Sequence, residues 1–64
     1  MSGTKKGFDA FIADKLKKGE RTEYISTEDS GNEYPTARIW HENNDQSWFG
    51  YIDGKWEFEG YEVY

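Results

Sequence analysis

The segment SWFGYIDGKWEFEGYEVY, residues 47–64, predicts a β-hairpin from which the rest of the fold follows. It contains Asp53-Gly54, a strong signal for a two-residue type I′ turn, because such a turn needs positive φ at both central residues. A hairpin closed by this turn has a fixed register, and its side chains alternate between two faces. Four aromatic rings should therefore share one face. The expected pairs are Ile52–Lys55, Tyr51–Trp56 and Phe49–Phe58.

The loop before this hairpin extends the register to another strand. We expect residues 43–45, Asn-Asn-Asp, to form a three-residue loop, because a loop of two or four residues would mix apolar and polar side chains on each face. The expected pairs are Trp40–Trp48, Ile39–Phe49 and Ala37–Tyr51. One apolar face follows, made of Ala37, Ile39, Phe49, Tyr51, Trp56 and Phe58.

The other strand signals lie nearer the N-terminus. Pro35 suits the start of a strand, because proline has no amide proton to give to a ladder. In the first strand, RTEYIST, the pattern leaves open whether Tyr24 or Ile25 points inward. The predicted strands are residues 21–27, 35–42, 47–52 and 55–64, with a polar, turn-rich loop at 28–33.

A helix should cover the apolar face. Apolar residues at i, i+3, i+4 and i+8 form one amphipathic stripe, and Gly19 suits the position after a helix end. We expect a helix at about Phe8–Lys18 after a flexible tail at residues 1–6. The fold class is then α+β, a single mini-domain at 7–64 with one N-terminal helix packed on one face of a three- to four-stranded antiparallel meander. The stripe consists of Phe8, Phe11, Ile12 and Leu16.

Composition limits how this chain can be stabilised. It has 64 residues, no cysteine and one histidine, which excludes disulfides, a thiolate zinc site and a thiol nucleophile. Twelve aromatic residues stand against six Leu, Ile and Val, so large rings have to build the core. Residues 1–21 carry a net charge of +3 and residues 22–64 a net charge of −8. An acidic body disfavours nucleic-acid binding and favours a partner with a basic surface.

The opposite face of the sheet is the candidate binding surface, because one short helix cannot cover both faces. Two interpretations remain open for its tryptophans. In the first, the tryptophans form a cross-strand pair that stabilises the sheet and is covered by a loop or the tail. In the second, they form a contact surface with the nearby arginine. The candidate partner-binding residues are Trp40, Trp48, Arg38, Glu57 and Glu59. In the expected register, Glu59 lies beside Trp48, and Arg38 and Glu57 flank Gly50.

No enzymatic chemistry is predicted. His41 has no second histidine or nucleophile in its local pattern, and Ser47 has no local base, so we expect no catalytic residue, metal site or cofactor. The favoured function is a protein-binding module, an inhibitor or modulator of a larger protein. A carbohydrate-binding module that stacks sugar rings on tryptophan and a self-associating structural domain are the alternatives.

Location and oligomeric state are expectations of the same kind. No apolar run approaches the roughly 18 residues that a membrane helix needs, and no signal-peptide core is visible near the N-terminus. The lack of cysteine fits the cytoplasm. We therefore expect a cytoplasmic monomer or weak homodimer with a protein partner and no membrane association.

Overall fold

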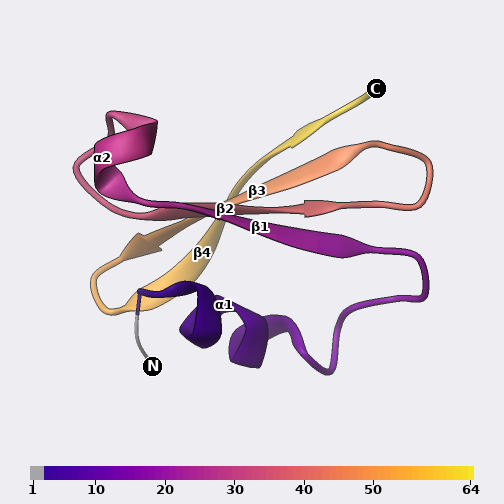
Figure 1. Ribbon diagram of the computed structural model, residues 1–64, viewed down its shortest axis with the longest axis horizontal. Coiled ribbons are helices and arrows are strands. Elements are labelled where there is room, and N and C mark those ends of the chain that lie inside the picture. Colours follow the sequence, from indigo (N-terminus) through magenta and orange to yellow (C-terminus); the bar gives the residue numbers. More distant parts are fainter. Residues whose placement is uncertain (1–2) are drawn as a thin grey trace.

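A four-stranded antiparallel sheet with the strand order β1-β2-β3-β4 forms the body of the molecule, and a short N-terminal helix packs on one face (Figure 1). The computed structural model describes residues 3–64. The predicted α+β class and the meander are confirmed. The elements are α1 (Lys5–Ile12), β1 (Arg21–Ile25), α2 (Thr27–Ser30), β2 (Thr36–Trp40), β3 (Gln46–Ile52) and β4 (Lys55–Glu62).

The β3–β4 hairpin confirms the prediction made from its turn. Asp53 and Gly54 have φ values of 53° and 79°, the signs that a type I′ turn requires. All three expected pairs are present, including Phe49 with Phe58. The register then shifts between Trp48 and Phe49, so that Trp48 pairs with Gly60 and one extra residue stands on β4.

The β2–β3 pairing differs from the prediction by two residues. Ala37 pairs with Phe49, and Arg38 rather than Trp40 pairs with Trp48. The loop has the expected length but lies one residue earlier, at 42–44, because His41 N donates to Asp45 O at 2.9 Å and Asn44 takes the positive φ of 74°. A register shift of two residues does not change which side chains share a face, so each predicted face keeps its residues. The predicted direct pair of Trp40 with Trp48 is wrong.

Helix α1 begins and ends earlier than predicted. Thr4 is its N-cap and accepts a hydrogen bond from Gly7 N, which places Lys5 and Lys6 in the helix instead of the predicted tail. Residues 1 and 2 of that tail lie outside the described residues. The helix ends at Ile12, and Leu16, the last residue of the predicted stripe, is exposed.

The shorter helix follows from the connection to β1. Asp9 accepts a hydrogen bond from Thr22 at 3.0 Å, which holds α1 beside β1. A helix that continued to Lys18 would leave two residues for the chain to return to Arg21. Residues 13–20 instead reverse the chain, with Gly19 at a φ of 86°.

The core is a lattice of aromatic rings between α1 and the sheet. The Phe8 ring lies 5.0 Å from Trp56 and 5.4 Å from Phe49, measured between ring centroids. Tyr24, not Ile25, faces this core, with its ring 6.4 Å from Trp56. Phe58 was predicted to lie inside but is 61% exposed, because α1 covers Trp56 and does not extend over Phe58, two residues further along β4. The buried apolar residues are Phe8, Ile12, Ala37, Ile39 and Trp56.

Candidate functional site

Arginine and tryptophan side chains alternate across the face of the sheet opposite α1. The Arg38 guanidinium carbon lies 4.6 Å from the ring centroid of Trp40 and 4.8 Å from that of Trp48. Arg21, directly opposite Trp40 on β1, lies 5.5 Å from the Trp40 ring. We call these four residues, Arg21, Trp40, Arg38 and Trp48, the Arg–Trp ladder. It spans β1, β2 and β3, and both of its indoles are half-buried.

Hydrogen bonds fix the central arginine in place. Arg38 Nε donates to Glu23 Oε1 at 2.8 Å, and Arg38 Nη1 donates to Gln46 Oε1 at 2.6 Å. Trp40 Nε1 donates to the same Glu23 oxygen at 3.2 Å. The Trp40 and Arg38 donors favour the ionised carboxylate and lower the pKa of Glu23. The observed β2–β3 register separates Trp40 from Trp48 and places the Arg38 guanidinium between their indoles.

The two predicted glutamates lie at the β4 side of this face, but one is displaced. Glu57 pairs with Gly50 as expected. Glu59 was expected beside Trp48, and that prediction is wrong, because the register shift places Gly60 there. Glu59 instead accepts a hydrogen bond from Tyr34 at 2.6 Å. Gly50 lies beneath this contact: a Cβ atom at Gly50 would come within 2.6 Å of Tyr34 and 2.8 Å of Glu59.

Glu23 and Glu62, which were not among the predicted binding residues, contact the Arg–Trp ladder. Trp48 Nε1 donates to Glu62 Oε1 at 3.3 Å. The connection between α2 and β2 does reach this face, through Tyr34 over Gly50, but the contacts described for it lie away from Trp40 and Trp48. The structure thus brings together Trp40, Trp48 and Arg38, and sets Glu57 and Glu59 nearer Gly50.

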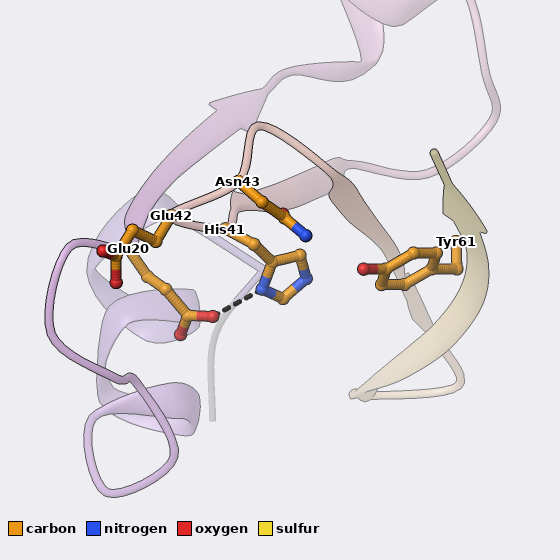
Figure 2. Close-up of a pocket in the computed structure, with 5 residues that line it drawn as sticks. All are labelled: Glu20, His41, Glu42, Asn43 and Tyr61. Atoms are coloured by element: carbon orange, nitrogen blue, oxygen red, sulfur yellow. Dashed lines mark hydrogen bonds and ion pairs between the residues drawn. The ribbon is translucent and has the colours of Figure 1, made fainter. Parts of the chain in front are cut away.

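A second polar cluster lies on the helix side of the sheet, beyond the end of α1. His41 Nδ1 is 2.5 Å from Glu20 Oε2, and His41 Nε2 is 2.7 Å from Ser47 Oγ. An open pocket of about 550 Å³ lies beside His41, whose ring stacks on Tyr61 at 5.5 Å (Figure 2). The residues that line it are Glu20, His41, Glu42, Asn43 and Tyr61.

The order carboxylate, imidazole, hydroxyl resembles that of a hydrolytic triad, but the hydroxyl is in the wrong place for attack. Ser47 is only 8% exposed and does not line the pocket. A nucleophile has to reach the substrate, so the geometry supports a structural role for this chain of contacts. It ties the 13–20 connection, through Glu20, to the β2–β3 hairpin. No local sequence pattern predicts this Glu20–His41–Ser47 chain of contacts, because Glu20 and His41 are 21 positions apart.

Two further findings concern the described residues as a whole. Within residues 3–64, no group of three or more His, Cys, Asp or Glu side chains is placed to hold a metal ion. In the same range, neither helix has the length and apolar character needed to cross a membrane.

Lowering the pH should destabilise the fold through its hydrogen-bonded carboxylates. Hydrogen bonds lower the pKa of Glu23 and of Glu20, whose main partner is His41. Near pH 4 the unfolded chain therefore binds more protons than the folded one, and the free energy of unfolding falls as the pH drops through about 4 and below. Urea denaturation between pH 3 and 7 measures this. Glu23→Gln should show a shallower pH dependence, whereas Glu28→Gln, a change at an exposed position, should leave it unchanged; equal slopes in all three proteins would refute the role of Glu23.

Comparisons with known proteins complete the description of the site. No protein-family model matches this chain, and no curated protein or solved structure matches it.

Proposed function

We propose that this chain is a non-enzymatic protein-binding module, an inhibitor or modulator of a larger protein, and that it binds through the sheet face opposite α1. The observation that supports this proposal is the Arg–Trp ladder, which lies on the face of the sheet opposite α1. The lack of cysteine fits a reducing compartment, and the proposal places the protein in the cytoplasm.

The residue types of the ladder favour a contact surface. Tryptophan and arginine are enriched among the few residues that dominate the affinity of protein interfaces. Arg38 is already held by Glu23 and Gln46, so binding would immobilise little additional side-chain freedom. A surface ordered before binding loses less entropy when it meets its partner.

Charge supports a basic partner. The whole chain carries a net charge of −5, and acidic side chains surround the ladder. They steer a positively charged surface toward it and disfavour nucleic acid. The acids on this side are Glu23, Glu57, Glu59 and Glu62.

The ladder geometry weakens the carbohydrate alternative. A sugar ring needs a free indole face on which to stack, but Arg38 contacts both indoles and Arg21 contacts Trp40 as well. A sugar would have to displace a guanidinium that hydrogen bonds hold in place.

Truncation of one ladder residue tests the proposal. Partners captured by the immobilised protein are identified, and their affinity is measured for the original chain, for Trp48→Ala and for Leu16→Ala. Trp48→Ala should weaken binding by about 30-fold, the cost of removing an interface hot spot. Leu16 is an exposed apolar residue outside the sheet, so its truncation is the matched control.

The fold of each variant is checked by amide dispersion in NMR spectra before affinity is compared. Equal affinities for the original chain and a folded Trp48→Ala variant would remove the ladder from the binding surface.

A further inference from the structure

The outer edge of β4 is a candidate binding surface separate from the Arg–Trp ladder. β4 is the last strand in the sheet order, and within residues 3–64 its only strand partner is β3. An edge strand offers backbone donors and acceptors to another chain. Proteins use such edges to bind extended segments, with the backbone providing affinity and alternate side chains providing specificity.

The direction of the backbone groups can be read from the neighbouring pairs. Tyr51 N donates to Pro35 O at 3.0 Å, which means that its amide points toward β2 and away from β4. The pair Tyr51–Trp56 is therefore a non-hydrogen-bonded pair, and so is Phe49–Phe58, two residues further along. In such a pair both residues turn their backbone groups outward, so the N–H and C=O of Phe58 face the open edge.

The side chains along this edge alternate in chemistry. Phe58 and Tyr61 lie on the helix side of the sheet and are 61% and 53% exposed. Glu57 and Glu62 lie on the ladder side, opposite Gly50 and Gln46, and Glu59 is exposed at the register shift. A strand that matched this edge would place apolar residues beside the rings and basic residues beside the carboxylates.

We propose that the partner contributes an extended segment of alternating basic and apolar residues, which adds to β4 as a fifth strand. This inference rests on the proposed function, since it specifies how a basic protein partner is engaged. The segment is short, because the register shift at Glu59 interrupts the regular edge.

Charge excludes a second copy of this chain as the occupant. Two β4 strands side by side would bring six glutamates together against two lysines, and like charges on facing strands are destabilising. Each copy also carries a net charge of −5. A basic segment has the complementary charge.

Short peptides with blocked ends test the proposal. The probe KVKFKVK alternates basic and apolar residues, and KVKPKVK has the same charge but loses a backbone donor at its centre. NMR titration should show that KVKFKVK protects the Phe58 amide from hydrogen exchange and binds about tenfold more tightly than KVKPKVK. Equal binding of the two peptides would overturn the proposal, as would a dimer in sedimentation measurements that forms through β4 without peptide.

Variants separate this edge from the Arg–Trp ladder. Phe58→Pro removes the outward amide and leaves the backbone hydrogen bonds between β4 and β3 intact. It should weaken KVKFKVK binding by about tenfold. Phe58→Val keeps the amide and is the matched control. Leu16→Ala, an exposed change outside the sheet, should leave peptide binding unchanged. Loss of peptide binding in Trp48→Ala with full binding in Phe58→Pro would overturn the edge proposal while supporting the ladder surface.

Discussion

Phe8→Ala should leave little or no folded protein at room temperature. Phe8 is fully buried, and its ring contacts three other rings, those of Phe11, Phe49 and Trp56. Truncation of a buried phenylalanine costs about 3–5 kcal/mol, since it removes apolar contacts and leaves a cavity. A domain of this size has a total stability of about 3–5 kcal/mol from a single core, so the variant loses most or all of it.

Phe58→Ala is the matched control for this change. Phe58 also contacts Phe49, at 5.7 Å between ring centroids, but it lies on the uncovered edge. Its truncation should change the free energy of unfolding by about 0.5 kcal/mol. Far-UV circular dichroism and urea denaturation measure both variants. A Phe8→Ala variant with a stability close to that of Phe58→Ala would mean that the ring lattice is not the core that holds the sheet and helix together.

Local turn chemistry explains why the sequence predicts the second hairpin so well. A two-residue loop at Asp53-Gly54 has one favoured geometry, so the pairs next to it have no alternative register. The first hairpin is different, because two three-residue loops, 42–44 and 43–45, keep the same side chains on each face. The observed loop puts Asn44 at positive φ, and Asp45 N bonds to Asn43 Oδ1 at 3.0 Å. Asparagine tolerates positive φ, so these local contacts favour the 42–44 loop. The alternation of apolar and polar residues cannot distinguish the two loops.

The candidate site was predictable as a face but not as a set of contacts. Alternation alone places Arg38, Trp40 and Trp48 on one side of the sheet. Which of them touch depends on the two-residue slide, and the position of Glu59 depends on a bulge that no turn residue marks. The Glu20–His41–Ser47 chain depends on where the 13–20 connection lies after α1 ends. Tertiary geometry fixes these features, and a local pattern in the sequence cannot specify them.

Arg38→Met should destabilise the fold by about 2 kcal/mol, although Arg38 lies on the sheet face away from the core. The change keeps the length of the side chain and removes its charge and its hydrogen bonds to Glu23 and Gln46. The two cation–π contacts are worth about 0.5–1 kcal/mol each at partly exposed sites. The ion pair with Glu23 adds little more, because 43% of the Glu23 side chain is exposed and solvent screens it.

Arg38→Lys separates charge from shape in this prediction. Lysine keeps the positive charge but lacks the planar fork that bonds Glu23 and Gln46 while lying against the indoles, so we expect about half of the Arg38→Met effect. For a domain of this size, 2 kcal/mol lowers the midpoint of thermal unfolding by about 8–16 °C, which calorimetry resolves. Combining each variant with Glu23→Gln gives the coupling between the two side chains. If Arg38→Met unfolds at the same temperature as the original chain, the ladder contributes nothing to stability. The cation–π contacts would then be a consequence of the register and not one of its causes.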